Sequence, residues 1–209
     1  MLEATIAPLL GSYKIVLIDD GSVVPVSSFL RAQGVFVLRH GINLGQGAAL
    51  QTGMDFAKLQ HATAVVHFDA DGQHNYLEIP LMLAPILASE ADFVLGSRFL
   101  SPQHIAQIPQ GRRWLLRAAR AVNYLFTGLY LSDAHNGFRA LSQKALENTQ
   151  LTECRMAHAT EILQIIKKSQ LPYTEVPTHI VYTDYSKQKG QSSLNAINIF
   201  FDLLLKNLF

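Results

Sequence analysis

Two pairs of acidic residues stand at the ends of apolar segments, where their carboxylates could bind a cation or a nucleotide. Asp69 and Asp71 follow the apolar run 64–68, and residues two apart at the end of a strand point to the same side. Two carboxylates on one side can share a divalent cation, Mg²⁺ or Mn²⁺. A pattern this short also arises by chance, and the alternative is a solvated turn that caps the following helix.

Asp19 and Asp20 end the apolar run 14–18 in the same manner and are followed by Gly21. One of these acids could accept hydrogen bonds from a nucleotide base or ribose, or could cap an ordinary turn. Further along, Gly45 and the glycine two residues later open a helical pattern, and backbone N–H groups at such a point can bind an anion. The alternative is that the glycines let the helix pack closely on the sheet.

The segment 93–132 contains no acidic residue but has five arginines, namely Arg98, Arg112, Arg113, Arg117 and Arg120. At helical spacing Arg113, Arg117 and Arg120 lie on one face of a helix. This pattern fits either an amphipathic surface helix or a helix that binds an anionic partner. The anion would be a phosphate or the surface of an anionic membrane. Nucleic acid is not expected as a partner, because the net charge is only +1 and aromatic residues do not alternate with the basic ones.

Composition points to one intracellular domain over residues 1–209. The 209 residues are 49% hydrophobic, which is enough for a core without cross-links. The single cysteine, Cys154, cannot form an internal disulfide, so a reducing compartment is expected. No apolar run is long enough to span a bilayer. The terminal segment 195–209 is predicted to be an amphipathic helix that packs on the domain or inserts at a membrane interface.

Apolar runs alternate with helical patterns through the first half of the chain, which predicts an α/β fold. Strands separated by helices form a mostly parallel central sheet with helices on both faces, and such sheets bind ligands at the carboxyl ends of their strands. A polar turn is expected over 133–139. The predicted strands are 14–19, 35–38, 64–69, 92–96 and 173–181, and the predicted helices are 46–59, 77–88, 111–130 and 157–169.

The succession of these polar motifs resembles family 2 glycosyltransferases with the GT-A fold, and more closely the branch that makes polyprenyl- and dolichyl-phosphate sugars. The resemblance covers nearly all of residues 14–195. The family has a first strand before the segment 14–19, which this chain apparently lacks, because residues 1–6 look like the start of a helix. The motifs are Asp19-Asp20-Gly21-Ser22, Asn43-Leu44-Gly45-Gln46-Gly47, Asp69-Ala70-Asp71-Gly72-Gln73-His74, Gly96-Ser97-Arg98 and Asn136-Gly137-Phe138-Arg139.

The resemblance implies a UDP- or GDP-sugar donor and a divalent cation as cofactor. Asp19 or Asp20 would contact the nucleoside, with Gly45 beside it. The metal, Mg²⁺ or Mn²⁺, would be held on the donor diphosphate by Asp69, Asp71 and Gln73. Lys189 lies in a segment that closes over the diphosphate in relatives.

The acceptor implied by the resemblance is a polyprenyl phosphate, used in cell-envelope glycan synthesis by a cytoplasmic enzyme that is peripheral on the inner face of the membrane. Arg98 and Arg112, with Arg113, would hold the acceptor phosphate. Asp133 and Arg139 belong to the family's acceptor-side turn. The residues expected to act in catalysis are Asp71, Asp133, Arg98 and Arg139, and Glu161 falls where this branch often has an acid.

Family 2 enzymes invert, so a single in-line displacement is expected, without a strong general base. Two other functions remain open from the sequence. One is transfer by the same fold to a saccharide or to another lipid. The other is a catalytically silent, membrane-docked binding domain.

Overall fold

The computed structural model describes residues 2–30, 33–102, 127–134 and 136–180, together with eight single positions between 105 and 125. Arg112, Lys189 and the expected terminal helix 195–209 lie outside the described residues, as do nine of the 20 positions of the expected helix 111–130. Among the described residues, none of the helices is both long and apolar enough to cross a membrane.

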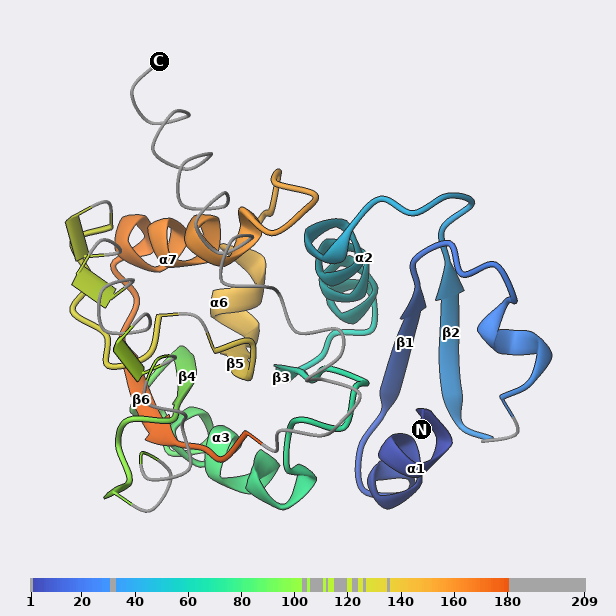
Figure 1. The fold of residues 1–209 in the computed structure, drawn as a ribbon, viewed down its shortest axis with the longest axis horizontal. Helices are drawn as coiled ribbons and strands as arrows, with labels where there is room; N and C mark the ends of the chain where they lie inside the picture. The colour runs from blue at the N-terminus through green and yellow to red at the C-terminus, as the bar shows by residue number, and fades with distance from the viewer. Residues whose placement is uncertain are drawn as a thin grey trace.

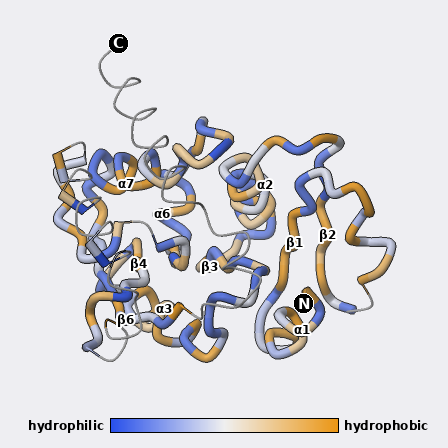
Figure 2. Tube along the Cα trace, viewed as in Figure 1, coloured by the Kyte–Doolittle hydropathy of each residue, from blue (hydrophilic) through white to orange (hydrophobic). Residues whose placement is uncertain are grey.

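The described elements alternate between strands and helices, as the apolar pattern predicts (Figure 1). Hydrophobic residues dominate β1 and β2 in Figure 2, in accord with the apolar runs from which these strands were predicted. In chain order the elements are α1 (Leu2–Ile6), η1 (Ala7–Leu9), β1 (Ile15–Asp19), η2 (Val26–Ser28), β2 (Val35–Arg39), α2 (Gln46–Leu59), β3 (Ala64–His67), η3 (Tyr76–Glu78), α3 (Ile79–Leu87), β4 (Phe93–Ser97), β5 (Arg139–Ser142), α6 (Gln143–Glu147), α7 (His158–Ser169) and β6 (Tyr173–Pro177).

The strands form two sheets. β1 and β2 pair in parallel, from Ile15 opposite Val35 to Asp19 opposite Arg39. The second sheet has the strand order β3-β5-β4-β6. β4 and β6 are parallel, whereas β5 is antiparallel to both of its neighbours. β3, β4 and β6 therefore run in one direction, and β5 is the exception in a mostly parallel arrangement.

β5 was not expected from the sequence, which predicted only a polar turn before residue 140. Its four residues, Arg139 to Ser142, are all buried between β3 and β4. Within this short strand Leu141 faces one core cluster and Ala140 the other. A strand that contains only two apolar residues between an arginine and a serine has no apolar run, which is why the pattern missed it.

No described strand pairs with both sheets. Residues 2–9 fold as α1 and η1, as predicted, and no described strand precedes β1. Among the described strands, β1 pairs with β2 alone and β3 pairs with β5 alone. Helix α2 packs against both β1 and β3 and so connects the two sheets. The α/β fold class predicted from the sequence is thus confirmed.

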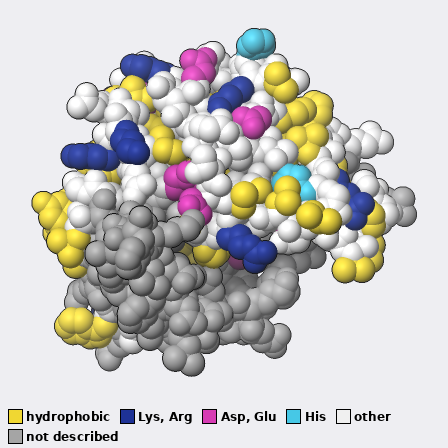
Figure 3. Space-filling view, turned by 90° about the horizontal axis from the view of Figure 1, so that it is seen from above, with side chains coloured by type: hydrophobic (Ala, Val, Ile, Leu, Met, Phe, Trp, Pro, Cys, Tyr) yellow, Lys and Arg dark blue, Asp and Glu magenta, His cyan; other side chains and the backbone are white. Residues whose placement is uncertain are grey.

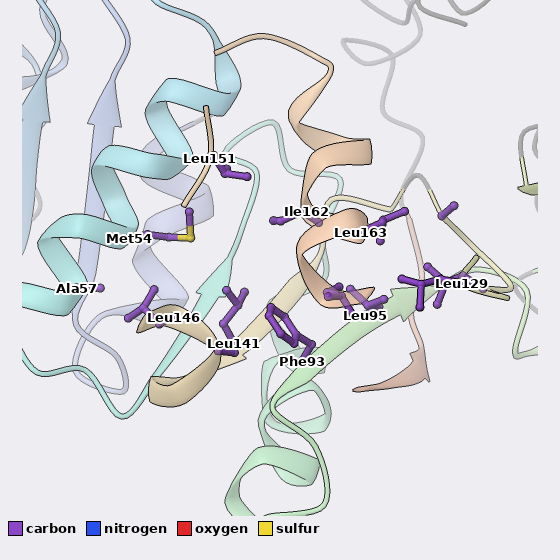
Figure 4. Packing of buried hydrophobic residues seen from close by; sticks show 14 residues of the cluster. Met54, Ala57, Phe93, Leu95, Leu129, Leu141, Leu146, Leu151, Ile162 and Leu163 are labelled. Carbon is purple, nitrogen blue, oxygen red and sulfur yellow. The ribbon is translucent and has the colours of Figure 1, made fainter. Parts of the chain in front are cut away.

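Helices cover both faces of the four-stranded sheet. On one face, Phe93 and Leu95 of β4 and Leu141 of β5 pack against α2, α6 and α7, with Met54, Leu146 and Ile162 among the contacts (Figure 4). On the opposite face, Val94 and Ala140 pack against Ile79 and Met82 of α3. Alternation along β4 sends successive residues to opposite faces, and burying both of them fixes the strand within the domain. This rigid sheet holds the loops at its carboxyl ends.

Candidate active site

Asp69 and Asp71 lie just after β3, close to the start of helix α2. Gln46, the first residue of that helix, donates a hydrogen bond from Nε2 to Asp69 Oδ1 at 3.3 Å. Asp71 is half-buried and accepts a hydrogen bond on Oδ1 from the backbone N–H of Gln73 at 3.0 Å. The Asp69 side chain is 39% exposed. Both carboxylates are therefore partly accessible at the same strand end.

The turn that precedes β5 packs directly against Asp69. A Cβ atom added to Gly137 would lie 3.1 Å from Asp69 Oδ2, so any other residue there would push the carboxylate aside by a few tenths of an ångström. The neighbouring Phe138 ring stacks on His74 with centroids 4.8 Å apart. His74 Nδ1 in turn accepts the backbone N–H of Asp69 at 3.1 Å. These contacts bring together two of the motifs that the sequence singled out, although they are more than sixty residues apart.

Buried charges around Asp69 shape its electrostatics. Burial raises the pKa of the Asp69 carboxyl, while the charges of Arg139 and His158 act in the opposite direction. Arg139 is only 3% exposed, and burial lowers its pKa to about 10 even though Asp69 and Asp133 favour its charged form. Arg139 therefore remains a cation at neutral pH and lies in the field of both carboxylates. A cation bound at Asp69 would relieve the cost of keeping that carboxylate ionised.

The oxygen atoms of Asp69 and Asp71 fit a hard divalent cation that is shared with a substrate. Asp69 and Asp71 offer carboxylate oxygens, the ligands that Mg²⁺ and Mn²⁺ prefer. In the part of the chain that the structure describes, no group of three His, Cys, Asp or Glu residues could hold a metal ion. The remaining ligands would have to come from water and from diphosphate oxygens, which is the usual arrangement for Mg²⁺ in phosphate sites.

Arg98 and Asp133 form a buried bidentate ion pair. Arg98 Nε donates to Asp133 Oδ2 at 2.5 Å, and Nη2 donates to Oδ1 at 2.7 Å. The backbone N–H of Arg98 adds a third hydrogen bond to Oδ2 at 3.1 Å. The side chains are 7% and 1% exposed. The structure thus brings these two predicted site residues together, with the guanidinium directed at Asp133.

Glu175 of β6 anchors this pair and was not singled out from the sequence. Its Oε1 and Oε2 accept hydrogen bonds from the backbone N–H of Ser132, and Oε1 also accepts the N–H of Asp133 at 3.2 Å. Glu175 lies in the strand β6, where the sequence shows no functional motif. Its hydrogen-bond partners lie more than forty residues away in the sequence. No local signal could have identified it.

The carboxylates of Asp19 and Asp20 are both engaged by the protein itself. Asp19 is buried and accepts the backbone N–H groups of Ser22 at 2.9 Å and Val26 at 3.0 Å, and it also pairs with Arg39 Nε at 3.3 Å. These bonds order the loop after β1. The predicted contact of Asp19 or Asp20 with a nucleoside stays a prediction.

Glu161 also holds a loop. Its Oε1 accepts the N–H of Thr152 at 2.9 Å and its Oε2 accepts the N–H of Glu153 at 2.9 Å. The adjoining Cys154 carbonyl accepts the N–H of Ala48 at 3.1 Å, so this loop packs on the start of α2. Glu161 thereby fixes the loop that supports Gly45 and Gln46.

Of the predicted acceptor-phosphate residues beyond Arg98, only Arg113 is described. Its Nη2 donates to the Ile105 carbonyl at 2.6 Å. Arg112 and Lys189 lie outside the described residues, so their roles stay predictions. Seen from the end where β1 and β2 terminate, basic and acidic side chains of the described residues lie interspersed (Figure 3). On that face the described residues form no large patch of one charge.

The α/β fold with a carboxylate pair at a strand end places the molecule among glycosyltransferases of the GT-A fold. Comparison with known proteins identifies the group more closely. The chain belongs to glycosyl transferase family 2, whose family model matches residues 1–149. The resemblance noted from the motifs is thus confirmed.

Two relatives support this membership. An uncharacterized protein of Methanocaldococcus jannaschii is 32% identical over 201 residues, which cover 95% of this chain and 83% of the relative. A UDP-N-acetylglucosamine–dolichyl-phosphate N-acetylglucosaminyltransferase of Methanococcus voltae is 34% identical over 173 residues, which cover 82% of this chain and 69% of the relative.

A solved structure confirms the fold independently. Glucosyl-3-phosphoglycerate synthase from Mycobacterium tuberculosis, solved with Mn²⁺ and UDP-glucose, aligns with a TM-score of 0.60 at 19% identity. The alignment covers 88% of this chain and 65% of that chain. At this identity the likeness concerns the fold alone.

Proposed function

We propose that this chain transfers a sugar from a UDP- or GDP-sugar to a polyprenyl phosphate, with inversion at the anomeric carbon and with Mg²⁺ or Mn²⁺ as cofactor. The observation that carries the proposal is the setting of Asp69, whose accessible carboxylate lies at the end of β3 against Gly137 and in the field of Arg139. The dolichyl-phosphate transferase among the relatives supports the acceptor class, and the fold neighbour with Mn²⁺ and UDP-glucose supports the donor class and the metal.

On the donor side, Asp69 and Asp71 would hold the cation, with Gln73 beside them. When bound, the ion neutralises the charge that develops on the leaving diphosphate. Gly45 opens α2 next to this point, and the nucleoside would extend toward Asp19 and Asp20 at the end of β1. Lys189 would close over the diphosphate.

On the acceptor side, a phosphate oxygen attacks C1 of the sugar. The new C1–O bond forms as the bond from C1 to the diphosphate oxygen breaks, and the electron pair leaves with the nucleotide. A phosphate monoester is already largely ionised at neutral pH, so no side chain must remove a proton. The protein then contributes positioning and charge, which is the role assigned to Arg98, Arg112 and Arg113.

Asp133 and Arg139 would support the acceptor site and the donor site. Asp133 holds the Arg98 guanidinium in place, and the positive charge of Arg139 offsets the negative charge of Asp69. Because a polyprenyl phosphate resides in a bilayer, the enzyme would work as a peripheral protein on the inner face of the cell membrane.

The first experiment measures donor binding. Isothermal titration with UDP-glucose, UDP-N-acetylglucosamine and GDP-mannose is carried out with Mn²⁺ and again with a chelator. We expect one donor to bind only with the metal, and Asp71→Asn to lose that binding. Asp55→Asn, which changes an acid on the far part of α2 whose side chain is 53% exposed, serves as the control. Metal-dependent turnover retained in full by Asp71→Asn would contradict the proposal.

The second experiment identifies the acceptor. The donor that binds is offered with a short-chain polyprenyl phosphate, with a diacylglycerol or with an oligosaccharide, and the products are separated. We expect product only with the polyprenyl phosphate, and NMR of that product should show an inverted anomeric carbon. Transfer to the diacylglycerol or the oligosaccharide alone would overturn the acceptor assignment and leave the family unaffected.

A further inference from the structure

A series of linked hydrogen bonds at the ends of β1 and β2 lies behind the candidate donor site. It joins Asp20, His40 and Thr52. Asp20 and His40 are the residues that directly follow the paired ends of β1 and β2, so the parallel register places them side by side. His40 Nδ1 lies 2.7 Å from Asp20 Oδ1, and His40 Nε2 lies 2.9 Å from Thr52 Oγ1 on α2. The Asp20 and His40 side chains are 18% and 11% exposed, so the hydrogen bonds between these side chains are largely shielded from water.

The Asp20 carboxylate holds the backbone of the glycine-containing loop. The N–H of Leu44 donates to Oδ1 at 2.9 Å, and the N–H of Gly45 donates to Oδ2 at 2.8 Å. The Asn43 side chain also donates to the Asp20 carbonyl at 3.1 Å. Burial tends to raise the pKa of the Asp20 carboxyl, but the hydrogen bonds from His40, Leu44 and Gly45 outweigh it and leave the pKa below its usual value. The carboxylate is therefore ionised, and its bonds are charge-assisted.

The loop needs such a restraint because of its backbone conformation. Gly45 has φ +105°, which side-chain-bearing residues rarely adopt, and a Cβ there would lie 2.5 Å from the Cys154 carbonyl oxygen. The N-cap residue of α2 is this glycine, and it offers no side chain to cap the helix. The position of the helix start thus depends on bonds from outside the loop.

The next residue, Gln46, contacts Asp69 Oδ1 at 3.3 Å. A continuous path therefore runs from His40 through Asp20 and the Leu44–Gly45 backbone to the carboxylate of the candidate metal site. A shift of the loop would move Gln46, and with it the first turn of α2, relative to Asp69.

We propose that His40 and Asp20 are positioning residues, in which His40 orients the Asp20 carboxylate so that it holds the Leu44–Gly45 backbone and thereby sets Gln46 against Asp69. Their effect on donor binding rests on the proposed function, whereas the restraint on the loop does not. Asp20 then acts on the donor site through the loop.

Thr52 fixes the ring of His40. Since an ionised carboxylate only accepts hydrogen bonds, Nδ1 of His40 carries a proton. In the neutral ring Nε2 is then an acceptor, and the Thr52 hydroxyl donates to it. Loss of this hydroxyl would free the ring to rotate without removing its bond to Asp20.

The test measures amide hydrogen exchange at Leu44 and Gly45 in His40→Leu, His40→Asn and Thr52→Val. Asparagine keeps a donor near the position of Nδ1, so it should preserve the restraint. We expect exchange at both amides to accelerate about tenfold or more in His40→Leu, to stay near wild type in His40→Asn, and to rise by a smaller factor in Thr52→Val. His61→Asn, a change at an exposed histidine far from the loop, is the control and should alter neither amide.

A second readout connects the restraint to the donor site. In a protein that binds donor, His40→Leu should raise the donor Kd about tenfold, and His40→Asn should rescue it. Unchanged exchange at Leu44 and Gly45 in His40→Leu overturns the proposal, whether or not any donor is found. Faster exchange together with an unaltered donor Kd overturns the connection to Asp69. If the wild-type protein binds none of the donors, the proposed function is contradicted. The exchange test then still decides whether His40 and Asp20 restrain the Leu44–Gly45 backbone.

Discussion

Arg98 and Asp133 face each other across 35 residues of sequence and join in a bidentate pair that is almost wholly removed from water. Three hydrogen bonds from Arg98 converge on one carboxylate, and Glu175 fixes the backbone on the other side. Removing one partner of such a pair lowers the stability of the fold strongly, because the other partner is left as a buried, unpaired charge. It therefore holds the start of the 98–132 segment to the turn that leads into β5.

Removing one member of this pair should destabilise the protein strongly. We expect Asp133→Ala to lower the free energy of unfolding by about 3 kcal/mol or more, because it leaves the Arg98 guanidinium buried and unbalanced. Urea denaturation measures the change. Glu147→Ala, which removes an exposed hydrogen bond from Gln143 on α6, should change stability by less than about 1 kcal/mol. The double variant Arg98→Met/Asp133→Leu should recover much of the loss, and a loss that is additive in the double variant would argue against the coupling.

A side chain at Gly137 should disturb the candidate metal site. The added methyl of Gly137→Ala would lie 3.1 Å from Asp69 Oδ2 and would displace that carboxylate. We expect metal-dependent donor affinity to fall about tenfold or more. Gly53→Ala is the matched control, because its Cβ would meet Ile18 at an ordinary 3.7 Å. Titration of both variants with donor and Mn²⁺ decides the matter, and equal affinities would show that Asp69 does not need its present position.

His67 should make the stability of the protein depend on pH. Both ring nitrogens are buried without a hydrogen-bond partner in the part of the chain that the structure describes. Burial, and then the charges of Arg139 and His158, lower the pKa of His67 from 6.5 to about 3. Below about pH 6.5, His67 is therefore protonated in the unfolded chain and stays neutral in the folded protein. The free energy of unfolding consequently decreases as the pH falls from 6.5 toward 3.

The expected slope is about 1.4 kcal/mol per pH unit from this group. His67→Leu should remove that share of the slope without lowering stability at neutral pH, because it deletes two buried nitrogens that lack partners. Denaturation of the metal-free protein between pH 7.5 and about pH 5 measures both effects. His61→Asn, at an exposed histidine, should leave the slope intact. An identical slope in wild type and His67→Leu would refute the assignment.

Glu161 should matter for the loop that supports α2. Glu161→Ala removes the acceptors of the Thr152 and Glu153 amides, and we expect a loss of about 1–2 kcal/mol. Because the same loop accepts the N–H of Ala48, exchange at that amide should also accelerate. Glu147→Ala, at an exposed acid of α6, provides the comparison. If exchange at Ala48 is the same in both variants, the loop does not depend on Glu161.

Much of the fold was predictable because its evidence is local. The apolar runs that became β1, β2, β3 and β4 are contiguous, and the helical spacing over 46–59 matches α2 residue for residue. The order of the polar motifs was enough to identify the family. That identification depended on which residues follow each strand, and the residues after a strand are fixed by the sequence alone.

The strand β5 shows where local evidence ends. Arg139 to Ser142 contains no run long enough to predict a strand, yet all four residues are buried between β3 and β4. Its conformation is decided by the backbone partners on both sides, which are residues 64–67 and 93–95. Propensity is a weak guide for a strand of this kind, since packing against neighbours determines it.

The sequence by itself determined that this chain has the elements and the ordered polar motifs of a family 2 glycosyltransferase, because strand periodicity and motif order are properties of neighbouring residues. Only the tertiary structure decided what each polar side chain contacts. It directed Asp20 to the Leu44–Gly45 backbone, Arg98 to Asp133, and Gln46 to Asp69. Those partners are 23 to 35 residues apart. The energy that selects them comes from burial and hydrogen bonding across the fold, which no local pattern records.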